Sequence, residues 1–231
     1  MKKNYLLGIG LLLAGSSFAQ VGQLSKAPAT GLNPNSTKTY VSQANAKDPG
    51  DSIWGSNFTD VSEWTIDNSG QTGPTFGWNI NATSQSWAAT MGTINSVSGG
   101  NYAELSNGNA NAGTQAMNVV YTLTTASQIT IPNSSISLQF LQHGARFNDA
   151  QEMLISVDNG INWIKVGDNS DIDALSDQGG AWYANPTKKV INLSSYIPTG
   201  TTQILVRFRW TTAIATTPTV ANYWITYGWG I

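Results

Sequence analysis

The sequence predicts an all-β fold, a two-sheet antiparallel sandwich, and three observations indicate this class. Residues Met153–Val166 hold two β-rich runs on either side of Asp-Asn-Gly, and Asn-Gly accepts the positive φ angles that a tight hairpin turn needs. In one late run large apolar residues alternate with more polar ones, so Phe208 and Trp210 should face the core. Arg207 and Arg209 should then project together from the opposite face. No long apolar stripe with the helical period is present.

Further strands are expected where short runs rich in β-branched and aromatic residues are bounded by Gly, Asn, Pro and Ser, as in a sandwich. The run at Ile136–Gln142 also alternates, although more weakly than the late run. In chain order the expected strands are Phe76–Ile80, Tyr102–Ser106, Ala116–Thr124, Ile136–Gln142, Glu152–Val157, Trp163–Val166, Lys189–Leu193, Gln203–Thr211 and Tyr223–Ile231.

Residues 1–19 have the three parts of a secretory signal peptide. Lys2 and Lys3 form a basic region, Leu6–Ala14 an apolar region, and Ser17–Ala19 a small-x-small cleavage site before Gln20. The apolar region is too short to span a membrane, and no later segment is long and apolar enough to do so. The sequence therefore predicts export, to the medium or the cell surface.

Residues 20–50 are rich in Ser, Thr, Asn, Ala, Gly and Pro, which predicts a flexible linker or N-terminal arm. A single domain is expected over residues 51–231. Without Lys2 and Lys3, the chain has 9 basic and 13 acidic residues, a net charge near −4. That charge excludes the basic surface typical of nucleic-acid and anionic-lipid binding. With no Cys, stability must come from the core rather than from disulfides.

Several motifs together resemble one family. They are the S-x-D-x-G-x-x-W hairpin (Ser156, Asp158, Gly160, Trp163), the R-F-R-W strand at Arg207–Trp210, the Gly-Trp-x-Ile end at Gly228–Ile231, and the runs Trp64–Trp78, Ala103–Asn107 and Gln142–Asp149. This set is similar to MAM-like, concanavalin-like jelly-roll sandwich modules of exported Bacteroidetes proteins, which use type IX secretion or gliding-associated export. The resemblance covers residues 51–231.

The resemblance implies a jelly-roll module of a larger secreted or surface protein, with a role in adhesion or in glycan or protein binding. In the family an Asp-Asp pair usually follows Gly-Trp-x-Ile, whereas this sequence ends at Ile231. We therefore expect a fragment of a longer protein, in which this domain is truncated at its C-terminus. The alternative is an accessory domain of an exported hydrolase, a glycosidase or a peptidase, whose catalytic part lies beyond residue 231.

The residue inventory argues against catalysis by this chain. There is no Cys, His143 is the only His, and no G-x-S-x-G is present, so a nucleophilic triad or a zinc site lacks its components. A glycosidase needs two carboxyl groups about 5 to 10 Å apart across a cleft. Glu104 and Glu152 lie in expected strands and could share a surface, although ordinary sheet-face carboxylates are commoner. We expect structural roles for His143, Glu104 and Glu152. We also expect that the chain needs no cofactor.

One acidic loop is a candidate for structural calcium. Its carboxylates, Asp168, Asp171, Asp173 and Asp177, recur as oxygen ligands do in calcium loops, but the Gly and Glu of an EF-hand are absent. A solvated acidic loop is the commoner reading of such a pattern. Ser52, in Asp-Ser-Ile, matches a short O-glycosylation pattern of exported Bacteroidetes proteins.

Aromatic residues are the main candidates for ligand binding, because Trp and Tyr are enriched at interfaces and stack on sugars. Core packing is expected for the tryptophans in patterned strands, Trp78, Trp163, Trp210 and Trp229, and loop positions for Trp87 and Trp224. Trp182 and Tyr183, in a Gly-rich loop, are a candidate sugar platform. Arg207 and Arg209 are the second candidate, and would favour carboxylate-bearing glycans or acidic protein surfaces.

Overall fold

The computed structural model describes residues 52–69, 76–81, 94–95, 101–106, 119–146, 149–172, 184–212 and 228–231. Within these ranges the chain contains no α-helix, only strands and one 3₁₀ turn, η1 (Val61–Glu63). No helix in the described part is long and apolar enough to cross a bilayer. The predicted signal peptide and the predicted arm, residues 1–50, lie outside these ranges and stay predictions.

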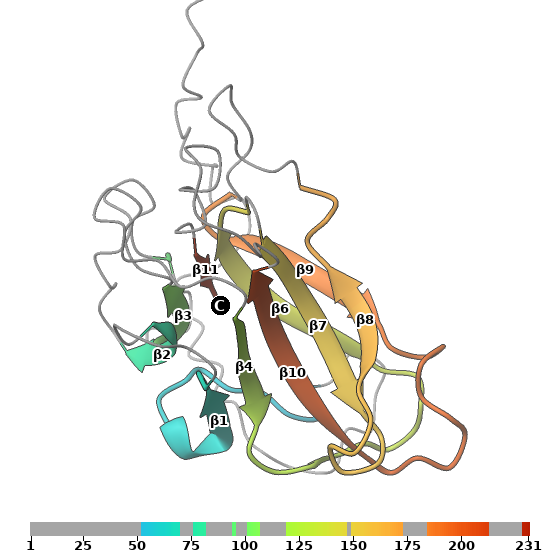
Figure 1. The fold of residues 1–231 in the computed structure, drawn as a ribbon. Coiled ribbons are helices and arrows are strands. Elements are labelled where there is room, and N and C mark those ends of the chain that lie inside the picture. Colours follow the sequence, from blue (N-terminus) through green and yellow to red (C-terminus); the bar gives the residue numbers. More distant parts are fainter. Residues whose placement is uncertain are drawn as a thin grey trace, which may run out of the picture.

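The strands form two antiparallel sheets, which confirms the all-β sandwich. The first sheet has the order β1 (Trp64–Asp67), β4 (Val120–Thr125), β10 (Gln203–Thr212), β7 (Asp149–Ser156) and β8 (Ile164–Asp168), with β5 (Ile129–Thr130) also paired to β10. The second has the order β2 (Gly77–Asn81), β3 (Tyr102–Ser106), β11 (Trp229–Gly230), β6 (Ser137–Gly144) and β9 (Thr187–Asn192). Figure 1 shows the two sheets as layers, with β10, β7 and β8 in front of β6 and β9.

The longest strand, β10, shows why these residues form a sheet with one buried face. Ile204, Val206, Phe208 and Trp210 are 0–3 % exposed, whereas Arg207 and Arg209 between them are only partly buried. This alternation follows from the period of two along a strand. The predicted facing of Phe208 and Trp210 toward the core, and of both arginines away from it, is confirmed.

Aromatic side chains from both sheets meet in the core. The ring of Phe208 lies edge-on to Phe140, with centroids 5.0 Å apart, and edge-on to Trp229 at 5.7 Å. Trp229 also contacts Trp78, at 5.5 Å between centroids. Such edge contacts add about 0.5 to 1.5 kcal/mol to the burial of apolar area. The core positions predicted for Trp78, Trp210 and Trp229 are therefore confirmed.

A chain of buried amides crosses the space between the sheets. The indole N–H of Trp229 donates to Gln142 Oε1 (2.8 Å), which also accepts from Asn169 Nδ2 (2.9 Å). Asn169 Nδ2 also donates to Gln151 Oε1 (2.9 Å), and Asn169 Oδ1 accepts from Gln142 Nε2 (3.1 Å). Gln151 Nε2 donates to Asp149 Oδ2 (3.0 Å). Because Gln142 and Asn169 are fully buried, these hydrogen bonds replace water that the interior excludes.

Most strand predictions held, with shifts of a few residues at the ends. Tyr102–Ser106 is observed as predicted, and the hairpin strands run over Asp149–Ser156 and Ile164–Asp168. The sequence did not reveal β1 or β5, which are only 4 and 2 residues long and become strands by pairing with β4 and β10. The starts of two predicted strands, residues 116–118 and 223–227, lie outside the described residues.

Candidate ligand-binding site

The connection between β7 and β8 is a loop held by its own side chains. Asn159 and Gly160 have φ angles of 60° and 86°, as the Asn-Gly prediction requires. Ser156 Oγ donates to Asp158 Oδ1 (2.7 Å) and accepts from the Gly160 N–H (2.8 Å). The Asp158 carboxylate accepts from the backbone N–H (2.9 Å) and the Nδ2 (2.7 Å) of Asn162. The loop runs over residues 157–163, longer than the two-residue turn that Asn-Gly favours, and these bonds set its shape.

Hydrogen bonds within this loop favour the ionised form of the Asp158 carboxyl group. The backbone and side-chain donors of Asn162, followed by the Ser156 hydroxyl, lower the pKa of Asp158 below its ordinary value. The loop is therefore most strongly held when Asp158 carries its charge.

Trp163 closes this loop and lies outside the core, which corrects the core position predicted for it. Its indole N–H donates to the Gly160 carbonyl oxygen at 3.1 Å, and the guanidinium carbon of Arg207 lies 3.6 Å from the ring centroid. A Cβ atom added to Gly160 would lie 3.6 Å from Leu205 Cδ1, so the loop lies against β10. Trp163 and Arg207 thus form a cation–π pair on the outer face of the first sheet.

Arg207 is fixed on two sides within this pair, which we call the Trp163–Arg207 stack. Its Nε–H donates to Thr124 Oγ1 on the neighbouring strand β4 at 2.9 Å, while Trp163 covers one face of the guanidinium. Burial, and then the nearby charge of Arg209, lower the pKa of Arg207, and the charge of Asp67 opposes this shift. Arg207 forms no ion pair with any residue of the described part.

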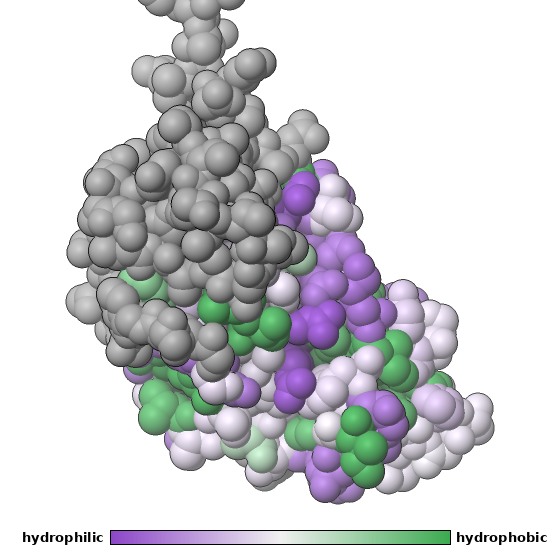
Figure 2. All heavy atoms as spheres, viewed as in Figure 1, coloured by the Kyte–Doolittle hydropathy of each residue, from purple (hydrophilic) through white to green (hydrophobic). Residues whose placement is uncertain are grey.

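Arg209 projects from the same face but has a carboxylate partner. Its Nε and Nη2 lie 2.8 and 2.7 Å from Glu152 Oε2 on β7. Lys165 Nζ lies 3.7 Å from the other oxygen of Glu152 and 2.8 Å from Asp168 Oδ2. Figure 2 shows hydrophilic residues gathered over β10, β7 and β8 on this face. The two arginines proposed together from the sequence therefore differ, because one is neutralised and the other is not.

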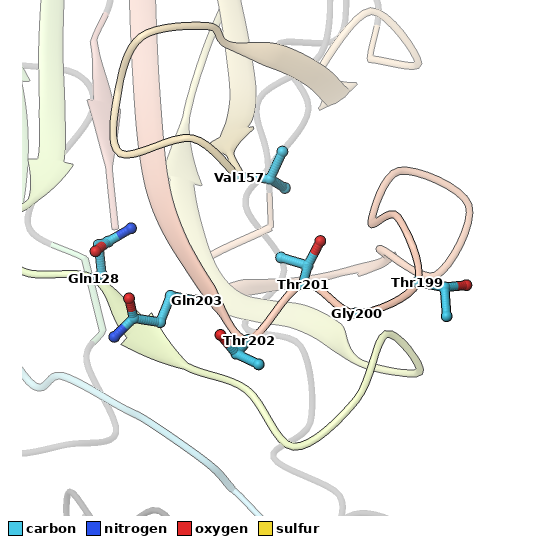
Figure 3. A pocket seen from close by; sticks show the side chains of 7 residues that line it. All are labelled: Gln128, Val157, Thr199, Gly200, Thr201, Thr202 and Gln203. Atoms are coloured by element: carbon cyan, nitrogen blue, oxygen red, sulfur yellow. The ribbon is translucent and has the colours of Figure 1, made fainter.

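A shallow hollow lies beside the stack, at the end of the sandwich formed by the β4–β5, β7–β8 and β9–β10 connections. It has a volume of about 410 Å³ and is lined by Gln128, Val157, Thr199, Gly200, Thr201, Thr202 and Gln203. Figure 3 shows Gln128 and Gln203 on one side and Thr199 on the other. The lining has hydroxyl and amide groups but no charge, and such groups both donate and accept hydrogen bonds. We call it the threonine–glutamine hollow.

The stack and the hollow are neighbours along β10. Gln203, Leu205 and Arg207 project from the same face of the strand, because alternate residues share a face. A strand rises about 3.3 Å per residue, so Gln203 and Arg207 are about 13 Å apart along β10. The loop that carries Trp163 lies over Leu205 between them, and its Val157 lines the hollow. One ligand of a few linked units could contact both.

The acidic residues predicted to bind calcium do not converge where the structure describes them. Asp168 bonds to Lys165 and to the N–H and hydroxyl of Ser170, and these contacts, led by Lys165, lower its pKa. Asp171 pairs with Lys189 on the other sheet at 2.9 Å. Asp173 and Asp177 lie outside the described residues. No group of three or more metal-ligating side chains occurs within the described ranges, and calcium binding stays a prediction.

The carboxyl groups considered for catalysis lie in different sheets. Glu152 projects from the first sheet beside Arg209, whereas Glu104 is buried, at 3 % exposure, on the side of β3 that faces away from the core residues Ala103 and Leu105. Both sheets and the core separate the two groups, so they cannot act across one cleft. His143 is 2 % exposed and pairs with Gly230 in the second sheet, which is a buried position.

Other predicted sites are less informative. Trp182 and Tyr183, the predicted sugar platform, lie outside the described residues, as do Trp87 and Trp224. The Ser52 hydroxyl donates to the Trp54 carbonyl oxygen at 3.0 Å and is exposed, and its glycosylation stays a prediction. Sequence reasoning missed the hollow altogether, because its residues come from three separate connections and share no motif.

Comparisons with known proteins leave the family open. No protein-family model matches the chain, and no curated protein matches its sequence. A structure of TmCBM61 in complex with β-1,4-galactotriose is similar over 74 % of this chain and 85 % of its own, with 13 % identity and a TM-score of 0.37. The enzymatically active domain of tailspike protein 4 of bacteriophage CBA120 is similar over 75 % of this chain but only 19 % of its own, with 13 % identity and a TM-score of 0.37. Similarities this low carry no argument about function.

Proposed function

We propose that this chain is a non-catalytic, exported binding module that holds an oligosaccharide on the outer face of the first sheet. The ligand would lie on the Trp163–Arg207 stack and reach the threonine–glutamine hollow. The leader and the resemblance to jelly-roll modules of exported Bacteroidetes proteins support the export, the adhesive role and the place in a larger protein.

The observation that carries the proposal is a rigid aromatic-cation pair beside an uncharged polar hollow. Trp163 is held by its bond to Gly160, and the loop below it by Ser156 and Asp158, so the ring is fixed before any ligand arrives. A preorganised site loses less entropy on binding than a mobile one. Hydroxyl and amide side chains in the hollow match the hydroxyl groups of sugars in hydrogen-bonding capacity.

We propose a non-catalytic module because the carboxyl groups of Glu104 and Glu152 lie in different sheets. Glu104 is buried in the second sheet and Glu152 projects from the first, where it pairs with Arg209 and Lys165. A single module of this kind would bind weakly, and several copies or further domains would raise the effective affinity.

The test is glycan-array binding by the secreted chain and by two variants, Trp163→Ala and Gln203→Ala. We expect the wild-type chain to bind at least one class of oligosaccharide and both variants to bind it about tenfold less, since each loses a contact worth about 1.4 kcal/mol. Lys188→Ala is the matched control, because Lys188 is an exposed strand residue of the other sheet.

Two outcomes would contradict the proposal. One is binding that neither Trp163→Ala nor Gln203→Ala weakens, and the other is the absence of binding to any oligosaccharide. Turnover of glycosidase, esterase or peptidase substrates that is lost in Glu104→Gln would contradict its non-catalytic part.

A further inference from the structure

Two arginines on one face of β10 differ in whether a carboxylate neutralises them. Arg207 and Arg209 both project from the outer face of the first sheet, two positions apart on β10. The register of β10 with β7 places Glu152 opposite Arg209 and Leu154 opposite Arg207. The charge of Arg209 is therefore neutralised by the Glu152 carboxylate on the neighbouring strand. The residue in the corresponding position beside Arg207 is Leu154, which has no charge.

The contacts of Arg207 hold it without neutralising it. Thr124 accepts its Nε–H and Trp163 covers one face, but neither carries a negative charge. Its two terminal nitrogens have no acceptor within hydrogen-bonding distance in the described part of the chain. These nitrogens form an end-on fork that matches the two oxygens of a carboxylate.

The other charges around Arg207 do not change this conclusion. Asp67, on β1, opposes the lowering of the Arg207 pKa, but the two side chains form no ion pair, and hydrogen bonds from Ser69 are the first causes of the lowered pKa of Asp67. Lys165, opposite Leu154, is paired with Asp168 and lies near Glu152. Among these cations, Arg209 and Lys165 have carboxylate partners within 4 Å, whereas Arg207 has none among the described residues.

We propose that Arg207 binds a carboxylate group of the oligosaccharide, so that the ligand is an acidic sugar chain of the uronic- or sialic-acid class. This rests on the function proposed above and names its ligand. An acidic sugar is favoured over an acidic peptide because the hollow, about 13 Å away along β10, offers hydroxyl and amide groups and no further cation. The carboxylate would lie on the fork of Arg207, and a neighbouring sugar would extend toward Gln203.

The experiment uses an array of matched glycan pairs, in which each uronate- or sialate-containing oligosaccharide is printed beside its carboxyl-reduced counterpart. A poly-glutamate peptide is included as a carboxylate source without sugar. The secreted wild-type chain is compared with Arg207→Gln, which removes the charge, and with Arg207→Lys, which keeps the charge but not the fork. Arg209→Gln serves as the control from the same strand and face. Thermal unfolding of each variant checks that it folds.

We expect the acidic member of at least one pair to bind and its reduced counterpart to bind about tenfold less or not at all, as a charge-assisted hydrogen bond implies. Arg207→Gln should abolish this preference and Arg207→Lys should reduce it, while Arg209→Gln retains it. Raising the salt concentration should weaken binding of the acidic member only.

Different results overturn different claims. Equal binding of both members of every pair, or an acid preference unchanged in Arg207→Gln and Arg207→Lys, would refute the role of Arg207 and leave the oligosaccharide-binding function standing. Binding of poly-glutamate as strong as that of the acidic glycan would refute the sugar class. Absence of binding to every oligosaccharide would refute both this inference and the proposed function.

Discussion

Replacing Asn169 by Ala removes the centre of the buried amide chain between the two sheets. Asn169 is fully buried, and its side chain takes part in three hydrogen bonds, one from Gln142 Nε2, one to Gln142 Oε1 and one to Gln151 Oε1. A buried hydrogen bond contributes about 1 kcal/mol, so their loss costs about 3 kcal/mol. Gln142 Nε2 also loses its acceptor in the interior, which brings the expected loss to about 4 or 5 kcal/mol.

Chemical denaturation followed by circular dichroism or tryptophan fluorescence measures this loss of unfolding free energy, and thermal unfolding measures the corresponding shift in melting temperature. For a chain of this size, a change of 1 kcal/mol shifts the melting temperature by about 2 to 4 °C, so Asn169→Ala should melt at least about 8 °C lower. Asn192→Ala is the matched control, because Asn192 is an exposed strand residue whose side chain accepts one hydrogen bond, from Ser194 N.

The control should cost about 1 kcal/mol or less. If Asn169→Ala costs no more than Asn192→Ala, the buried amides do not stabilise the sandwich as argued. A midpoint shift without a change in the denaturant slope would show that the variant still unfolds as one unit.

Three further predictions concern the sheet, the hairpin loop and export. Gly144→Ala should destabilise the fold strongly, because the added Cβ would lie 2.4 Å from a backbone oxygen, whereas Gly230→Ala, whose Cβ would find no atom nearer than 3.5 Å, should unfold close to wild type. Hydrogen bonds lower the pKa of Asp158, so its contribution is present above the unfolded-state pKa of about 3.9 and is lost as the pH falls through the folded-state pKa. The stability difference between wild type and Asp158→Asn should therefore narrow below about pH 4 in denaturation curves, and a constant difference would contradict this. Mass spectrometry of exported protein should find Gln20 as the first residue, and exported material that retains Met1 would refute the predicted cleavage.

The fold class was accessible from the sequence because alternation along a strand is a local property. Residues of β10 reveal their buried face without knowledge of any partner, and the prediction for Phe208 and Arg207 was correct for that reason. The strand at the edge of the first sheet was harder to predict from the sequence. Strand β1 has 4 residues, and its strand character comes from pairing with β4, far along the chain.

Trp163 shows where local reasoning failed. It was predicted as the first residue of a patterned strand, Trp163–Val166, and was therefore expected in the core, whereas β8 begins at Ile164. The hydrogen bonds of Ser156 and Asp158 instead shape a loop that lays the ring on the outer face, against Arg207. The motif that contains Trp163 was visible, but the direction of the ring depends on contacts with a strand more than 40 positions away.

The amino-acid order by itself determined that Arg207 and Arg209 share a face, because side chains two positions apart on a strand point the same way. It also determined the hairpin, because Asn159 and Gly160 accept the backbone angles of the turn. Only the tertiary structure decided which arginine has a carboxylate partner. The register of β7 against β10 places Glu152 beside Arg209 and Leu154 beside Arg207, and a register between distant strands is set by the packing of the whole core.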